Sequence, residues 1–476
     1  MIVDRHTPAD LFSLVPQSLL GFEPELAQLD ALLDDDQLFQ AVRSDLASRA
    51  PQSRTRGRPG TPVEVVLRML VLKRLYGWSY AETERFVSDS LVLRQFCRVY
   101  LERAPDDTTL IRWAGCVGAS TLERLNERAV ELARQHKVTR GRKLRIDSTV
   151  VETDVHHPTD SSLLRDGVRV LSRLLRRAKR ALGEEAAQAA ALPKQVFRTR
   201  MPSVRRAVQQ IHRTARRRGE GAAEELHRAY EKLIGVAEAT QAQAERVAAV
   251  LKECTEEEIE HLTRGFDRFL PLMKRAISQA RRRVLEGGTV PSPEKLLSLF
   301  EPHTQTLVRH KAGKPVEFGR KLILDEAEGG IVTRYEVLPE PGPDHLHLAK
   351  SLATHQERFG RAPDLLAGDR GLYSAENEQA ARDAGVRHVV LPKTGRITAE
   401  RQAYERQRWF RRGFRFRAGA EGRISVLQRK YGLNRCLYHG EAGMQRWVGW
   451  AVLTSNLSKI ASTVAARGAR RTCGPA

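Results

Sequence analysis

The apolar positions in the N-terminal part of the chain recur with a helical period. They follow that spacing over 65–75 and stop at Gly77, and a second helix is predicted from Ser79. The later stretch APDDTTLIRW predicts a further helix with Asp107 or Thr108 as its cap. This part of the chain is therefore expected to be all-α.

After about residue 140 the pattern changes from helical to alternating. The stretch KLRIDSTVV predicts a strand, because apolar and polar residues alternate from Leu144 to Asp147. From about 165 to 298 the sequence is rich in Ala, Arg, Glu, Leu and Gln and predicts long helices. Strand-like runs return at 321–324 and 331–337, where the intervening EAEGG predicts a hairpin turn.

A βαβ unit follows the hairpin. Leu365 to Gly368 predicts a strand, Ser374 caps a helix that Gly385 ends, and His388 to Leu391 predicts the second strand. This order of elements describes an α/β fold, with a mixed sheet, flanking helices and a helical insertion after the first strand.

The chain of 476 residues is long enough for several compact parts. We expect five segments. They are an N-terminal arm over 1–55, a helical domain over 56–140, an α/β domain over 141–165 and 299–460, a helical insertion over 166–298, and a basic disordered tail over 461–476.

The chain is strongly basic. It has 80 Lys and Arg against 58 Asp and Glu, a formal charge of +22 and a pI near 10.2, which favours nucleic acid as a partner over a merely soluble basic protein. Arg58 and Arg112 lie in the helical domain over 56–140. Its short helices and tight turns fit a helix-turn-helix type of DNA-binding unit, and equally an ordinary helical bundle with a solvated face.

Cysteines and histidines give no metal signature. The five cysteines include no CxxC pair, which argues against a disulfide framework or a zinc finger and fits a reducing cytoplasm. His156 and His157 with Asp160 suggest zinc, but adjacent histidines on an extended chain point to opposite sides. We interpret HHPTDSSLL as a turn and a helix start, capped by Asp160 or Ser161. No signal peptide or run of about 18 apolar residues indicates export or a membrane.

Three carboxylates are the candidates for chemistry. Asp147 lies in or after the first predicted strand, Asp369 follows another, and Glu421 is expected to open a helix. Brought together, they would repel one another unless Mg²⁺ or Mn²⁺ neutralised them, and two such ions can drive phosphoryl transfer. The alternative is that each is a solvated turn residue or a cap.

Arginines alternate with aromatic residues just before Glu421, in RQRWFRRGFRFR. Trp409, Arg412, Arg415 and Arg417 in this stretch suit phosphates and exposed bases, so DNA beside Glu421 is one hypothesis. The other is a strand with its aromatic side chains in the core and its arginines in solvent.

Several stretches resemble the DDE transposases of bacterial insertion sequences, in the ISNCY-like, IS1182-like and IS5-like group. They are RIDSTVVETDVHHPTDSSLL, GDRGLYS, RAGAEGRISVLQRKYGLNRC and, nearer the N-terminus, GRPGTPVEVVLRMLVLKRLYGWSYAETE with PDDTTLIRW. The resemblance spans about 55–460. It implies a ribonuclease H-like core, two Mg²⁺ or Mn²⁺ ions, and Asp147, Asp369 and Glu421 as catalytic residues and metal ligands. In GDRGLYS, Arg370 and Tyr373 become candidate DNA contacts, although Tyr373 equally fits a loop support.

The chain departs from the related signature around the glutamate. That signature is Tyr, two residues, Arg, three residues, Glu, six residues and Lys, whereas this chain has Phe414, Arg417, Glu421 and Gln428 at those places. The tyrosine hydroxyl is absent. Lys430, two places late, or Arg429 is the candidate for the last phosphate contact.

The resemblance implies a transposase that cleaves and joins DNA at the ends of its own insertion sequence. Its expected partners are terminal inverted repeats, target DNA and a second copy of the chain, in the bacterial cytoplasm with the nucleoid and not at a membrane. Two alternatives remain: a catalytically silent repressor that binds DNA ends, and a host nuclease of the same fold.

Overall fold

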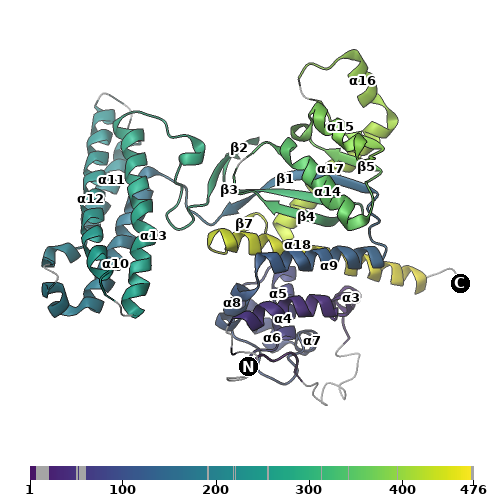
Figure 1. Cartoon of the computed structure of the whole chain (residues 1–476), viewed down its shortest axis with the longest axis horizontal. Helices are drawn as coiled ribbons and strands as arrows, with labels where there is room; N and C mark the ends of the chain where they lie inside the picture. Colours follow the sequence, from purple (N-terminus) through teal and green to yellow (C-terminus); the bar gives the residue numbers. More distant parts are fainter. Residues whose placement is uncertain are drawn as a thin grey trace. The chain divides into compact units, whose positions relative to one another are not determined.

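The structure is a computed structural model of a mixed α/β protein (Figure 1). It describes residues 1–6, 21–49, 52, 60–189, 192–217, 219, 221–254, 257–311, 314–340, 342–393 and 395–472. These residues form two compact units, unit 1 over Met1–Glu152 and Arg320–Ala476 and unit 2 over Thr153–Gly319. Over the described residues, no helix is both long and apolar enough to span a bilayer.

Unit 1 begins with short helices. They are α3 (Pro24–Leu33), α4 (Asp36–Ser48), α5 (Val63–Tyr76), α6 (Tyr80–Asp89), α7 (Leu91–Phe96), α8 (Asp107–Cys116) and α9 (Ala119–Gln135). The helices predicted before Gly77 and from Ser79 are confirmed, since Gly77 ends α5 at φ 71° and Ser79 caps α6 in a capping box with Glu82. The predicted cap of α8 was one or two residues late, because the Asp106 carboxylate accepts from Thr109 N.

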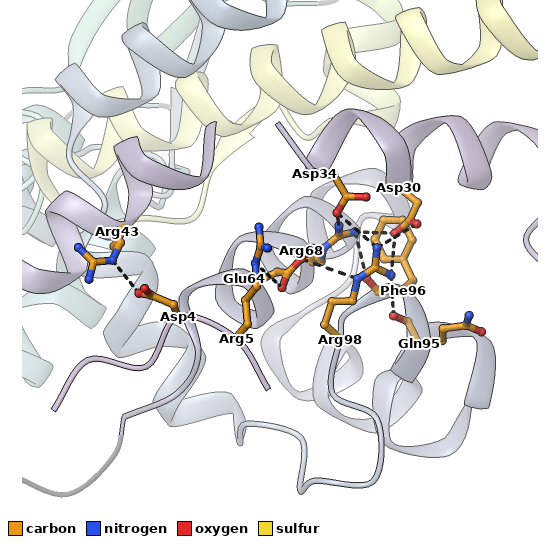
Figure 2. Close-up of polar contacts among 10 residues, drawn as sticks. All are labelled: Asp4, Arg5, Asp30, Asp34, Arg43, Glu64, Arg68, Gln95, Phe96 and Arg98. Atoms are coloured by element: carbon orange, nitrogen blue, oxygen red, sulfur yellow. Dashed lines mark hydrogen bonds and ion pairs between the residues drawn. The ribbon is translucent and has the colours of Figure 1, made fainter. Parts of the chain in front are cut away.

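A buried arginine holds the first helices together (Figure 2). The Arg68 side chain is 0 % exposed and donates to Asp30 at 2.6 Å, to Asp34 at 2.5 Å and to the Phe96 carbonyl at 3.2 Å. Glu64, one turn earlier on α5, lies 3.3 Å from Arg68 Nε. A single guanidinium thus joins α3, α5 and the end of α7 through charge-assisted hydrogen bonds.

A second buried arginine on α5 joins these helices to the C-terminal part of unit 1. Arg74 donates to the carbonyls of Tyr431 and Trp447 at 3.1 and 3.4 Å and lies 3.8 Å from the centre of the Trp447 ring. The hydroxyls of Tyr80 and Tyr438 share a hydrogen bond of 2.5 Å. The N-terminal helices also share one hydrophobic core with α18 (Gly440–Thr472).

The sheet contains β1 (Lys143–Thr153), β2 (Gln305–Lys311), β3 (Lys314–Ala327), β4 (Ile331–Val337), β5 (Leu365–Gly368), β6 (His388–Val390) and β7 (Arg435–Cys436). Its main order is β2-β3-β1-β5-β6, with β4 on β3 and β7 on β1. The β3–β4 pair is antiparallel, and β5 is parallel to both β1 and β6. The predicted first strand, hairpin and βαβ unit are confirmed.

The other helices of unit 1 are α14 (Leu348–Phe359), α15 (Ala375–Asp383), α16 (Ala399–Arg406), α17 (Arg408–Lys430) and α18. The expectation of a disordered tail from residue 461 was wrong for most of that segment, since α18 continues to Thr472. Ile460 and Ala461 explain the difference, because both are buried in the core that α18 shares with the N-terminal helices.

Unit 2 consists mainly of packed helices, which confirms the helical prediction for this segment. They are α10 (Asp160–Ala189), α11 (Met201–Thr214), α12 (Ala222–Leu251) and α13 (Glu257–Ala280). Leu171, Leu233 and Phe266 belong to their common core. The predicted cap of α10 was wrong, because the hydroxyl of Thr159, and not a side chain at 160 or 161, accepts from Ser162 N at 3.1 Å.

Candidate active site

Asp147 and Asp369 lie on neighbouring parallel strands. The β1–β5 register pairs Ile146 with Gly368, and each aspartate is the next residue along its strand direction. The Asp147 side chain is 11 % exposed, and one of its oxygens accepts from the Ser148 N–H at 2.8 Å. The strand register therefore brings two carboxylates together where β5 ends, although Asp147 itself lies within β1, which continues to Thr153.

Asp369 is held at the start of a short turn of helix. Its carboxylate accepts from the Leu372 N–H at 3.2 Å and so caps η5 (Arg370–Leu372). Burial raises the pKa of Asp369 and the nearby negative charge of Asp344 raises it further, while the turn's N–H groups and Arg417 oppose the rise. Asp369 thus lies in a site already crowded with negative charge.

Glu421 reaches the same region from α17, but not from the start of a helix as predicted. It lies in the second half of α17, whose buried residues Phe410, Gly413, Ala420 and Leu427 recur at helical spacing. The alternative of a strand through the arginine and aromatic stretch is wrong for the same reason. Gly413 allows α17 to approach the sheet, because a Cβ there would lie 2.5 Å from a Val390 methyl carbon.

Arg417 lies between two of the predicted acids. Its Nη2 is 3.0 Å from Glu421 Oε1 and 3.9 Å from Asp147 Oδ2. Its position one turn before Glu421 places both side chains on one face of α17. The Glu421 side chain is 71 % exposed, so this ion pair is open to solvent on one side.

Asp344 is a further acid at the site that we did not predict. It lies 2.6 Å from Lys321 Nζ and accepts from the Ser148 hydroxyl at 3.1 Å. Gly371 has an oxygen of Asp344 and an oxygen of Asp369 on one side, 3.4 and 3.3 Å from where its Cβ would be. The sequence signal was weak, since Asp344 lies seven residues after the predicted strand over 331–337, whereas Asp369 directly follows its own strand.

A buried ion pair supports α17 beneath the acids. Arg145 Nη2 is 2.6 Å from Glu326 Oε1, and its Nη1 donates to the Phe416 carbonyl at 2.6 Å. Gly419 leaves room for this guanidinium, because a Cβ there would lie 2.4 Å from Arg145 Nη1 and would displace it from its present position. These contacts fix α17 against β1 and β3 and so determine where Glu421 is presented.

The chemical type of the side chains at this site suits a divalent cation. Asp147, Asp369 and Glu421 offer hard carboxylate oxygens, which Mg²⁺ and Mn²⁺ prefer. Within the described part of the chain, however, no three acidic, histidine or cysteine side chains are grouped closely enough to hold a metal ion. The positive charge between Asp147 and Glu421 is supplied by Arg417.

The two histidines after β1 have other partners. His156 Nε2 lies 3.5 Å from an oxygen of Asp166, and the His157 ring packs edge-on against Phe318 at 5.6 Å. These contacts agree with our interpretation of this stretch as a turn before a helix rather than as a zinc site.

Apart from Arg417, which pairs with Glu421, the predicted DNA contacts fall into three groups. Exposed side chains are Arg112, Arg370, Arg412, Arg415 and Lys430. Two aromatic candidates are partly buried and packed: the Trp409 ring stacks on His388 at 4.8 Å, and Arg401 covers the Tyr373 ring at 5.0 Å. The Tyr373 contact favours the loop-support alternative. Arg58 lies outside the described residues.

Comparison with known proteins gives one match. A family model described as a transposase domain (DUF772) matches residues 14–115, which include helices α3 to α7 and all but the last residue of α8. The three candidate carboxylates lie outside the matched segment. No curated protein matches the chain. No solved structure matches it either.

Proposed function

We propose that the protein is a DDE transposase that cleaves and joins DNA at the ends of its own insertion sequence. The observation that carries the proposal is the convergence of Asp147 and Asp369 on adjacent parallel strands, with Glu421 tied to Asp147 through Arg417. The transposase-domain match over 14–115 supports the same class of protein. We assign the sheet and its helices to a ribonuclease H-like core.

In this proposal Asp147, Asp369 and Glu421 would hold two divalent cations, once the three carboxylates come closer together than they lie in the structure. When bound, Mg²⁺ or Mn²⁺ supplies charge neutralisation and activation for phosphoryl transfer. Lys321 balances part of the charge of Asp344 at 2.6 Å, and Ser148 donates to the same carboxylate. These two residues keep Asp344 in place beside Asp369.

The reaction consists of two displacements at phosphorus. Water attacks a phosphodiester at the element end, the P–O3′ bond breaks, and the products are a 3′ hydroxyl and a 5′ phosphate. The 3′ oxygen then attacks a phosphodiester of target DNA, forms a new P–O bond and displaces the target strand's own 3′ oxygen. The site must hold the attacking and leaving oxygens in line in both steps.

Arg417 has two roles in the proposal. Without DNA it keeps Asp147 and Glu421 near one positive charge. An exposed pair of this kind contributes only about 0–1 kcal/mol, so little free energy opposes the separation of Glu421 from Arg417. The freed guanidinium then contacts a DNA phosphate, next to the exposed Arg412, Arg415 and Lys430.

The proposed partners are the terminal inverted repeats and target DNA, bound by a homodimer that brings two ends together. The net charge of +22 supports binding to DNA. We place the protein in the bacterial cytoplasm with the nucleoid.

A second candidate is a repressor that binds DNA ends without cutting them. The specific observation in its favour is Arg417, which stands between two acids of the proposed triad.

Labelled DNA from both flanks of the gene, incubated with the full-length protein and Mg²⁺ or Mn²⁺, tests the proposal. A transposase yields a cut at the element boundary with a free 3′ hydroxyl, and Glu421→Gln abolishes the cut while retaining DNA binding. Binding without any cut favours the repressor. Cutting that does not depend on terminal repeats indicates a host nuclease of the same fold.

A further inference from the structure

Helix α10 of unit 2 exposes only positive charge over Asp160–Leu182, the part whose side chains the structure describes. Between Asp160 and Leu182, every residue classed as exposed is arginine or lysine. These residues are Arg169, Arg173, Arg176, Arg177, Lys179 and Arg180. Their spacing of three or four residues arranges most of them along one side of the helix.

The acids of this segment do not neutralise the exposed row. Asp166 is 3 % exposed and lies 3.1 Å from Arg169, at the beginning of the row, and 3.8 Å from Arg165. Asp160 is also buried and pairs with Arg283 at 2.7 Å. From Arg173 to Arg180, no ion pair with a described residue is present.

Two grooves flank α10, and both are lined by arginines. The groove toward α11, with a volume of about 410 Å³, is lined by Arg173, Arg176 and Arg205 among others. The groove toward α13, of about 480 Å³, is lined by Arg173, Arg177 and Arg264 among others. Among the described residues, no Asp or Glu lines either groove. The cationic row therefore widens into a cationic face that spans three helices.

An ordinary solvated helix has a different surface, as α12 of the same unit shows. Its exposed charged residues are Glu224, Arg228, Glu231, Lys232, Glu245 and Arg246, which balance in sign. Opposite charges one turn apart support a helix, whereas like charges at that spacing destabilise it. The row on α10 thus opposes the stability of its own helix, which indicates that an anionic partner covers it.

We propose that the α10 face binds the sugar-phosphate backbone of duplex DNA. From Arg169 to Arg180 the row is about 17 Å long, at 1.5 Å per residue. One DNA strand presents a phosphate every 3.4 Å of axis, so the row matches about five phosphate steps. Guanidinium groups bind phosphate oxygens in pairs of hydrogen bonds and carry no base preference by themselves. DNA as the polyanion rests on the proposed function.

The test compares two variants of the full-length protein with equal loss of charge. One carries Arg173→Gln, Arg176→Gln and Arg177→Gln on α10, and the control carries Arg228→Gln, Lys232→Gln and Arg246→Gln on α12. Affinity for a duplex of unrelated sequence is measured by fluorescence anisotropy over a range of KCl concentrations. Circular dichroism establishes that both variants are folded.

The α10 variant is expected to bind on the order of 100-fold more weakly at physiological salt, with a slope of log K against log salt smaller by about 2 to 3. The α12 variant should retain the wild-type slope. An unchanged slope in the α10 variant overturns the inference. The inference is also overturned if the α10 variant keeps the wild-type slope but no longer self-associates in sedimentation. The face would then contact a second copy of the chain.

The same samples separate this inference from the proposed function. Wild-type cleavage with an unchanged slope in the α10 variant overturns only the inference. If the wild-type protein cuts no element end and the α10 variant has a reduced slope, the DNA-binding face is supported and the transposase proposal is contradicted.

Discussion

The arginines of α5 and of α10 have opposite environments. On α5, Arg68 is fully buried and donates hydrogen bonds to Asp30, Asp34 and the Phe96 carbonyl. Arg74, on the same helix, is buried against the Trp447 ring. On α10, the row from Arg173 to Arg180 faces solvent and has no acidic partner among the described residues. The N-terminal helices use arginine to hold the fold, whereas α10 presents arginine outward.

The cations of a basic sequence can therefore serve two purposes: buried ones stabilise the fold, and exposed ones can bind DNA. The net charge of +22 attracts DNA wherever it lies, but only exposed and unpaired cations exchange counterions for phosphates. Arg74 belongs to the helical domain predicted to bind DNA, but its guanidinium is buried and hydrogen-bonded within the fold. The helical insertion, by contrast, has a uniform cationic face on α10.

The largest effect on stability is expected at Arg68. Arg68→Met removes the fully buried partner of Asp30 and Glu64, although Arg98 still pairs with both. The free energy of unfolding should therefore fall by about 3 kcal/mol, the lower end for a broken buried ion pair. Denaturant unfolding measures this change, with Arg173→Met on α10 as the control. A loss at Arg68 no larger than the loss at Arg173 would contradict the division between the two helices.

Lys73 gives a pH test of the buried cations on α5. Burial, with the neighbouring Arg74, lowers the pKa of Lys73 to about 8, while Glu82 opposes the shift. Between pH 8 and the ordinary value of 10.5, the unfolded chain holds more protons, so stability should rise with pH. The rise amounts to about 3 kcal/mol at most.

The variant Lys73→Met isolates this contribution, because other groups titrate in the same range. The free energy of unfolding, measured from pH 7 upward, should increase more steeply in the wild type than in Lys73→Met. Parallel curves for the two proteins would show that burial does not lower the pKa of Lys73 in the folded protein.

The smallest effect on stability concerns the α10 row itself. Replacing Arg173, Arg176 and Arg177 by Gln removes like-charge pairs, each of which costs a few tenths of a kcal/mol. Stability should therefore be unchanged or higher by up to about 1 kcal/mol. The α12 variant should instead lose a little stability, because Arg228 lies 3.8 Å from Glu224. Thermal unfolding of the two variants compares these changes, and a marked loss in the α10 variant would show a structural role.

Local patterns predicted the elements well. The β3–β4 hairpin and the βαβ unit followed from alternation, glycines and caps that act within a few residues. The neighbours of each side chain could not be predicted in the same way. The partners of Arg74 lie 357 and 373 residues away, and only the packed fold brings them together.

In the candidate site, too, the elements were easier to predict than the neighbours of each side chain. Asp369 was predictable as an acid directly after a strand, and Asp147 as an acid in or after the first strand. The β1–β5 register makes them neighbours. The place of Glu421 in the middle of a helix was missed, because arginines and aromatics alternate in sequence although their buried face follows helical spacing. Asp344 was missed because a polar residue after a strand is usually a turn residue.

The central claim is that Asp147 belongs to a DNA-cleaving centre. The most direct measurement compares Asp147→Asn with Glu152→Gln, a matched change in the same strand, on labelled element ends with Mn²⁺. The proposal predicts that Asp147→Asn binds the ends but yields no cut strand, whereas Glu152→Gln cuts at the wild-type rate. Cleavage by Asp147→Asn at the wild-type rate would contradict the account.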